Sequence, residues 1–348
     1  MKVCIIGDGL TSLALAKTLV NQDIYVDLVC SHKTKNYDKT RTIGLSKNNV
    51  DFFNKNIANI NKFLWKIEKI EIFSENLKSE KIIEFEKNNQ QLFSLIKNYK
   101  LYDFLKINLK KNKFFKIIKN KNNFEKIKRE YQLIIVCDKN NQFLKKYFYK
   151  KFTKSYNSYA YTTIINHKKI YKNNIATQIF TKKGPLAFLP ISESKTSVVY
   201  SYRGFEKIDL RSLIKKYNKR FQNVKVSKIS SFKLNLSNLR TYHHENILAF
   251  GDVIHRIHPL AGQGFNMNVR DISKLLKLIK EKIDNGLVLD SSVCKDFEKS
   301  MKHKNFLFSN GIDLIYEIFK LEGNIKNNVI GKTIKFGTLP NMFTSYRT

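Results

Sequence analysis

Long apolar runs and clustered cysteines are both missing from this sequence of 348 residues. No run is long enough to span a bilayer, and the chain opens directly on a strand pattern, so neither a transmembrane helix nor a signal peptide is expected. The four cysteines, Cys4, Cys30, Cys137 and Cys294, are far apart and include no metal-type pair. This usage predicts a protein of the reducing cytoplasm.

Acidic residues are also scarce, with 29 against 64 lysines and arginines, which gives a formal net charge of +35. Such an excess attracts anionic surfaces, either membrane or nucleic acid. The lysines are spread along the chain among abundant Asn and Ile, so we attribute most of the charge to an AT-rich coding sequence. An anionic membrane surface is kept as a secondary expected partner. Nucleic acid is not expected, because no nucleic-acid motif is present.

A dinucleotide-binding pattern occupies the first residues. Residues 2–6 read as a buried strand and residues 13–20 as a helix. Between them, Gly7, Gly9 and Ser12 have the spacing of a strand–turn–helix fingerprint. Gly7 allows the tight turn and Gly9 allows close approach of a pyrophosphate. Ser12 replaces the third glycine, whose position serves helix–strand packing.

The next strand pattern, residues 24–29, ends without the acidic residue that usually holds an adenosine ribose. Cys30 stands at that place and is followed by Ser31. A thiol cannot hold both ribose hydroxyls as a carboxylate does, and Ser31 substitutes only in part. We therefore expect weaker adenosine binding within an unchanged fold.

The most informative stretch runs from Gly251 to Asn268. It follows a buried-strand pattern at residues 246–250 and precedes an amphipathic helix expected over residues 269–283. Its glycines let a backbone come close to a ligand, and the helix N-terminus offers free N–H groups and a positive dipole end. Asp252, at the end of the strand, can accept hydrogen bonds from sugar or ribityl hydroxyls.

Within this stretch, Gly-Asp-x-x-His-x-x-His-Pro-Leu-Ala-Gly-Gln-Gly-x-Asn at residues 251–266 resembles the second flavin-binding motif of the FAD-dependent aromatic hydroxylases. The closest resemblance within these class A flavoprotein monooxygenases is to the ubiquinone-biosynthesis hydroxylase branch. Residues 184–190, Gly-Pro-Leu-Ala-Phe-Leu-Pro, resemble a segment of the same branch that runs along the substrate side of the flavin. One departure is Lys139, which follows Asp138 where relatives have Asp-Gly in a motif linked to FAD and NAD(P)H. We expect Asn140 to supply the positive φ of the missing glycine.

The resemblance implies an α/β fold with a Rossmann-like FAD-binding domain of the GR2, or p-hydroxybenzoate-hydroxylase-like, type. An inserted, mostly antiparallel β-sheet would form the substrate domain, and helices would follow at the C-terminal end. The FAD-binding domain is expected to be discontinuous, and helical patterns within it are predicted over residues 50–66 and 91–110. The expected division assigns residues 1–66, 91–150 and 240–310 to the FAD-binding domain, 67–90 and 151–239 to the substrate domain, and 311–348 to a C-terminal helical segment.

The resemblance also implies which residues contact FAD. The expected contacts are Gly7, Gly9, Leu10, Thr11, Ser12, Arg41, Asp252, Pro259, Gly262, Gln263, Gly264 and Asn266. No side chain is expected to act as a catalytic acid or base, because the flavin carries the chemistry, and Pro259 would shape the reactive flavin face. His255 and His258 have a metal-type spacing, but no cysteine or carboxylate cluster accompanies them, so no metal is expected.

In relatives, FAD is reduced by NAD(P)H and reacts with O2, and the resulting flavin hydroperoxide hydroxylates an electron-rich aromatic ring. The resemblance therefore predicts a monooxygenase acting on a polyprenylated phenol in ubiquinone biosynthesis, either cytoplasmic or peripheral on the inner face of the membrane. Other quinone-biosynthesis proteins are further expected partners. Three alternatives stay open: a related flavoenzyme acting on another aromatic or isoprenoid substrate, a flavin-binding reductase, and a non-catalytic flavin-fold subunit of a quinone-biosynthesis complex.

Overall fold

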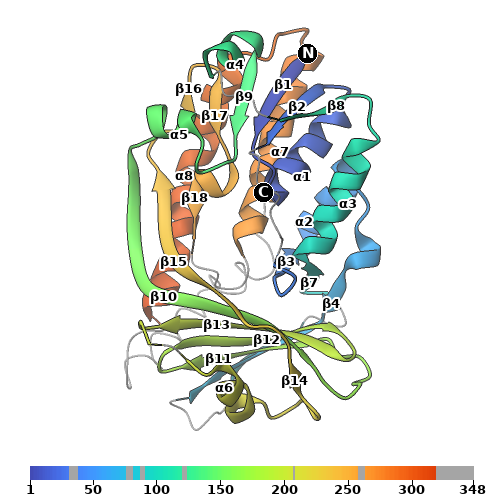
Figure 1. Ribbon diagram of the computed structural model, residues 1–348, viewed down its shortest axis with the longest axis vertical. Helices are drawn as coiled ribbons and strands as arrows, with labels where there is room; N and C mark the ends of the chain where they lie inside the picture. Colours follow the sequence, from blue (N-terminus) through green and yellow to red (C-terminus); the bar gives the residue numbers. More distant parts are fainter. Residues whose placement is uncertain are drawn as a thin grey trace.

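The computed structural model describes residues 1–30, 38–75, 81–86, 91–119, 124–206, 208–257 and 263–318. A parallel sheet flanked by helices forms one half of the molecule, and a larger, mostly antiparallel sheet forms the other (Figure 1). This arrangement confirms the predicted α/β class with an inserted β-sheet.

The parallel sheet has the strand order β16-β17-β9-β1-β2-β8, in which only the edge strand β16 runs antiparallel. Its central strands are largely apolar because helices cover both faces. The carboxyl ends of the parallel strands meet at one edge, where ligands of such folds bind. The strands are β1 Lys2–Ile6, β2 Tyr25–Cys30, β8 Phe115–Lys119, β9 Leu133–Val136, β16 His243–His244 and β17 Ile247–Ala249.

Helices pack around this sheet. Helix α1 contacts α3 and α7, and α7 in turn contacts α8. Helix α8 passes residue 310 without a break, so the C-terminal segment predicted from residue 311 continues an existing helix. The helices of this half are α1 Leu10–Val20, α2 Lys47–Asn56, α3 Asn98–Lys110, α4 Phe124–Glu130, α5 Gln142–Tyr147, α7 Gln263–Asp284 and α8 Ser291–Ile318.

The larger sheet has the order β18-β15-β10-β13-β12-β11-β5-β6, with β14 paired to β10. Helix α6 (Leu210–Tyr217) covers its outer face, on which Leu186, Phe188 and Tyr200 are buried. The strands are β5 Lys69–Ser74, β6 Lys81–Glu86, β10 Lys151–Asn166, β11 Ile175–Thr181, β12 Gly184–Ser192, β13 Lys195–Arg203, β14 Lys225–Val226, β15 Ser230–Leu239 and β18 His255–Arg256.

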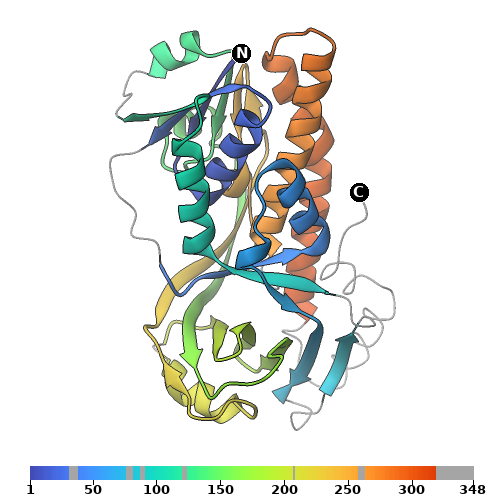
Figure 2. The ribbon, with the colours of Figure 1, turned by 90° about the vertical axis from the view of Figure 1, so that its right-hand side faces the viewer.

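The long strands β10 and β15 form an antiparallel ribbon that joins the two halves (Figures 1 and 2). Its register runs from Lys151↔Leu239 to Thr162↔Ser230, with an irregularity between Ser155 and Ser158. At the other side of the sheet, the parallel pairing of β5 with β11 brings β5 and β6 into one sheet with the strands of residues 151–239. The domain boundaries themselves stay a prediction.

A small third sheet, β3-β7-β4, lies between the halves (Figure 1). Its strands are β3 Thr42–Ser46, β4 Trp65–Ile67 and β7 Phe93–Lys97. The helices predicted over residues 50–66 and 91–110 are therefore wrong in part, since α2 ends at Asn56 and residues 93–97 are a strand. Both regions are rich in aromatic residues, and such apolar runs fit strands and helices equally well.

Candidate cofactor site

The turn after β1 requires a glycine at its first position. Gly7 has a φ of +117°, and a Cβ added to it would lie 3.1 Å from the backbone nitrogen of Asp138. Its N–H donates to the carbonyl of Val29 on β2 at 2.9 Å. Strands β1, β2 and β9 thus converge on this turn.

Gly9, two residues later, is different, because its φ of −74° suits any residue. A Cβ added there would meet no atom of the described part of the chain within 4 Å, so space lies open beside the start of α1. Helix α1 begins at Leu10 with no side-chain cap and no acidic residue in its first turn. Its first N–H groups have no partner within the helix and present the positive dipole end, which suits an anionic group such as a pyrophosphate.

A hydrogen-bonded chain of side chains connects this turn to the segment that follows β17. The Nδ2 of Asn268 on α7 donates to Asp252 Oδ1 at 2.7 Å and to Thr11 Oγ1 at 2.9 Å. Gly251 has a φ of +69°, and a Cβ added to it would lie 2.8 Å from Thr11 Cγ2. Asn268 therefore holds Asp252 beside the N-terminus of α1, a role for which sequence reasoning did not single it out.

The end of β9 adds a neutral group to this edge. Burial, together with the carboxylates of Asp252 and Asp138, raises the pKa of the Cys137 thiol to about 12, although the nearby Ser12 hydroxyl acts in the opposite direction. The thiol therefore stays protonated at neutral pH and adds no negative charge beside the proposed pyrophosphate position.

The turn after β9 forms without the glycine of the relatives. The carboxylate of Asp138 accepts from the backbone N–H of Asn140 at 3.1 Å, and the Asp138 carbonyl accepts from that of Asn141 at 3.1 Å. Neither Lys139 nor Asn140 is among the described residues with a positive φ. The expectation that Asn140 replaces glycine in the left-handed region is therefore wrong, because this turn needs no such residue.

Three further expected contacts, Gln263, Gly264 and Asn266, lie at the start of α7. Gln263 begins the helix, and a Cβ added to Gly264 would meet none of the described atoms within 4 Å. The Nδ2 of Asn266 donates to the Gly44 carbonyl at 2.8 Å, and its Oδ1 accepts from Ser46 N–H at 3.0 Å. Asn266 thus uses its side chain to fix α7 against β3. The expected contacts Pro259 and Gly262 lie outside the described residues.

Arg41 lies where β3 meets the β10–β15 ribbon. Its guanidinium carbon is 5.0 Å from the centre of the Phe232 ring. Nearby, Thr40 and Thr162 are joined through their hydroxyls at 3.0 Å, and the Thr42 and Ser197 hydroxyls lie 2.9 Å apart. These contacts place Arg41 between the two halves, and its contact with FAD stays a prediction.

The described residues contain no group of three His, Cys, Asp or Glu side chains that could hold a metal ion. Over the same part of the chain, no helix is both long and apolar enough to cross a membrane. The structure thus brings Gly7, Gly9, Thr11, Ser12 and Asp252 together at one edge of the parallel sheet. The open space, free helix N-terminus and hydroxyl-accepting carboxylate of this edge fit the diphosphate and sugar alcohols of FAD.

Comparison with known proteins also points to FAD binding. Residues 206–287 match the FAD binding domain family. The chain is 30% identical over 152 residues to the 3-demethoxyubiquinol 3-hydroxylase of Escherichia coli, covering 41% of this chain and 39% of that protein. It is 25% identical over 209 residues to the mitochondrial ubiquinone biosynthesis monooxygenase of Rattus norvegicus, covering 47% and 44% respectively. The matches thus span less than half of these relatives.

Solved structures share the fold over nearly the full length. The p-nitrophenol 4-monooxygenase of Pseudomonas putida superposes with a TM-score of 0.77 at 12% identity, covering 99% of this chain and 98% of that one. A probable FAD-dependent monooxygenase of Pseudomonas aeruginosa gives 0.74 at 13% identity, with 96% and 99% covered. The sequence relatives confirm the predicted resemblance, the family match supports FAD as the cofactor, and the solved structures confirm the predicted fold.

Proposed function

We propose that this chain, which resembles the ubiquinone-biosynthesis hydroxylases in sequence and FAD-dependent monooxygenases in fold, is an FAD-dependent monooxygenase that hydroxylates an aromatic ring. The observation that carries the proposal is the open space at Gly9, bordered by the N-terminus of α1 and by the Asp252–Asn268–Thr11 chain. The bound FAD would supply the oxygen-transfer chemistry, with NAD(P)H and O2 as co-substrates.

The residues of the chain would bind and orient the cofactor. The N–H groups of Leu10 and Thr11 would hold the pyrophosphate, and Asp252 would accept hydrogen bonds from ribityl hydroxyls. On the substrate side, Leu186 and Phe188 of β12 point into the core under α6, so Leu189 lies on the opposite face. There it packs with Trp65 and Leu95 of the small sheet and would keep water from the reacting ring.

A polyprenylated phenol is the substrate that we propose. The names of the curated relatives point to ubiquinone biosynthesis. An apolar cluster also lies where the β10–β15 ribbon meets the start of α7, and its character suits a ring or a prenyl tail. It consists of Tyr156, Ala160, Leu234, Leu236, Ile257, Met267, Phe308 and Ile312.

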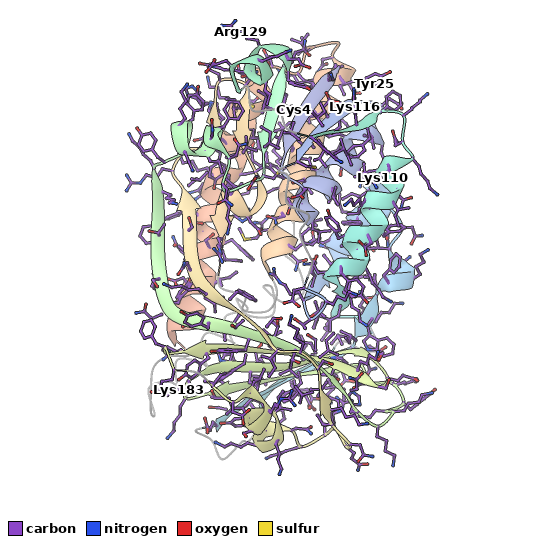
Figure 3. All side chains as sticks on the ribbon, in the orientation of Figure 1. Cys4, Tyr25, Lys110, Lys116, Arg129 and Lys183 are labelled. Carbon is purple, nitrogen blue, oxygen red and sulfur yellow. The ribbon has the colours of Figure 1, made fainter. Side chains whose placement is uncertain are left out.

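An anionic membrane surface would bring such a substrate to a protein with a charge of +35. The labelled basic residues Lys110, Lys116, Arg129 and Lys183 project outward from both halves of the molecule (Figure 3). This spread favours diffuse attraction rather than a single docking patch.

The test of the proposed activity is NAD(P)H oxidation by the FAD-loaded protein with and without a prenylated phenol. We expect the phenol to stimulate oxidation and to gain the mass of one oxygen atom. Stimulation without a hydroxylated product would point to a flavin-binding reductase. If prenylated phenols have no effect but another aromatic compound is hydroxylated, the substrate assignment is wrong and the activity stands.

A second candidate is a non-catalytic flavin-fold subunit of a quinone-biosynthesis complex. Cys30 ends β2 beside the Gly7 turn, at the place where relatives hold the ribose with an acid. Lys139 lends this candidate less support, because its turn forms without strain. A yellow protein that never oxidises NAD(P)H, with any phenol, would favour it.

The thiol at Cys30 leads to a gain-of-function prediction. A carboxylate introduced by Cys30→Glu can accept hydrogen bonds from both ribose hydroxyls, so the Kd for FAD should fall about tenfold. Quenching of flavin fluorescence measures this Kd directly. Cys30→Ser removes the thiol without adding a carboxylate and should leave the Kd unchanged. Equal affinities for the glutamate variant and the natural protein would place the ribose elsewhere.

A further inference from the structure

Two hydrogen-bonded pairs tie the segment that follows β17 to helix α7. Asp252 Oδ1 accepts from Asn268 Nδ2 at 2.7 Å, and His255 Nε2 lies 2.5 Å from Asp271 Oδ2. The second pair is displaced by three residues from the first on both segments. Because residues three apart on a helix are neighbours on one face, the pairs form successive links between the segment and the helix.

The His255–Asp271 link is inaccessible to solvent and to any ligand. His255 is 2% exposed and Asp271 is fully buried. Asp271 Oδ1 also accepts from Asn305 Nδ2 on α8 at 3.3 Å, and Asn305 Oδ1 accepts from Arg270 at 3.1 Å. The link is thus anchored to a second helix.

The chemistry of the pair fixes which atom donates. An ionised carboxylate can only accept, so Nε2 of His255 carries the hydrogen. In the described part of the chain, His255 Nδ1 has no hydrogen-bond partner. His255 is therefore the donor to a buried carboxylate.

We propose that His255 and Asp271 are positioning residues for the cofactor site, an inference that rests on the proposed binding of FAD. Their link sets the register of α7 against residues 251–255. The same register places Asn268 so that it reaches both Asp252 and Thr11. Loss of the link lets Asp252 and the start of α7 shift relative to α1, and weakens FAD binding without removing any group that touches FAD.

The test compares three variants by the Kd for FAD, measured below the melting temperature of each. His255→Leu removes the donor and should raise the Kd roughly tenfold, the loss expected for one hydrogen bond to a charged group. His255→Gln keeps an N–H at a similar reach and should restore the Kd to within about threefold of the natural value. The double variant His255→Leu with Asp271→Leu leaves no buried charge. It keeps the test possible if the single variant fails to fold, and its Kd should also rise.

Tyr131→Phe is the matched control. Tyr131 donates to the buried Asp27 of β2 at 2.5 Å, toward the amino ends of the parallel strands and away from the cofactor edge, and Asp27 keeps an ion pair with Lys2 at 2.8 Å. This variant also loses a buried donor to a carboxylate, so its melting temperature should fall while its Kd for FAD stays unchanged.

Several outcomes would overturn the inference. The first is an unchanged Kd for FAD in both leucine variants. The second is a Kd for His255→Gln as high as that for His255→Leu. The third is an equal rise in the Kd for Tyr131→Phe, which would mean that any loss of stability weakens FAD binding. If the natural protein takes up no FAD, the proposed function is wrong. The inference is then wrong with it, whatever the melting temperatures of the variants.

Discussion

Replacing Gly9 with leucine should remove FAD binding while leaving the protein folded. The backbone at Gly9 has an ordinary φ, and an added Cβ meets no atom of the described residues within 4 Å, so the apo protein has room for a side chain. Leucine is a poorer N-cap than glycine, and the free energy of unfolding should fall by no more than about 1 kcal/mol. In the proposed complex, however, the new side chain would occupy the position of the pyrophosphate.

We expect the Kd for FAD to rise at least ~100-fold, which is the loss of about 3 kcal/mol of binding free energy. Isothermal titration calorimetry measures the Kd, and circular dichroism checks the fold. Gly286→Asn is the control. Gly286 also faces open space, at the far end of α7, and its φ of +67° is one that asparagine tolerates. Undiminished FAD binding by a folded Gly9→Leu variant would show that the pyrophosphate lies elsewhere.

Replacing Gly184 with alanine should cause the largest loss of stability. Gly184 begins β12 with a φ of +129°, and an added Cβ would lie 2.0 Å from the backbone carbonyl oxygen of Ser201. A backbone atom inside a sheet cannot move aside as a side chain can. Strain and overlap together should lower the free energy of unfolding by about 4 kcal/mol. Thermal melting of the apo protein, followed by circular dichroism, measures the loss.

Gly204→Ala provides the comparison for this prediction. Gly204 has a similar φ of +135°, but an added Cβ would meet the side chain of Tyr202, the nearest atom being its hydroxyl oxygen at 2.9 Å. We expect a cost of roughly 1–2 kcal/mol, since the backbone strain remains and the overlap can relax. Equal losses in the two variants would mean that the Ser201 carbonyl does not restrict this position.

The cofactor edge could be predicted from sequence because its determinants are local. Gly7 and Gly9 follow an apolar strand and precede a helix, and Asp252 follows another such strand. Parallel strands bring their carboxyl ends to one edge, so these residues had to converge once the strands were recognised. The confirmed α/β class follows from the same patterns.

Other features could not be predicted because they depend on tertiary contacts. From the sequence, His255 was considered only together with His258, and nothing in the residue types paired it with Asp271 on α7. Trp65 was expected in a helix but lies in β4, where its ring nitrogen donates to the Asn173 carbonyl at 2.7 Å. Asn266, expected to contact FAD, uses its side chain to join α7 to β3. In each case the partner lies on another element of the fold, which the local sequence does not identify.

The most direct test of the central claim is the visible absorption spectrum of the purified protein, before and after anaerobic addition of NADH or NADPH. We predict flavin bands, present on purification or after incubation with FAD, that bleach when the reductant is added. Bands that resist both nucleotides would leave FAD binding intact but contradict direct reduction, and would favour the non-catalytic subunit. A colourless protein that takes up no added FAD would contradict the central claim that this protein binds FAD.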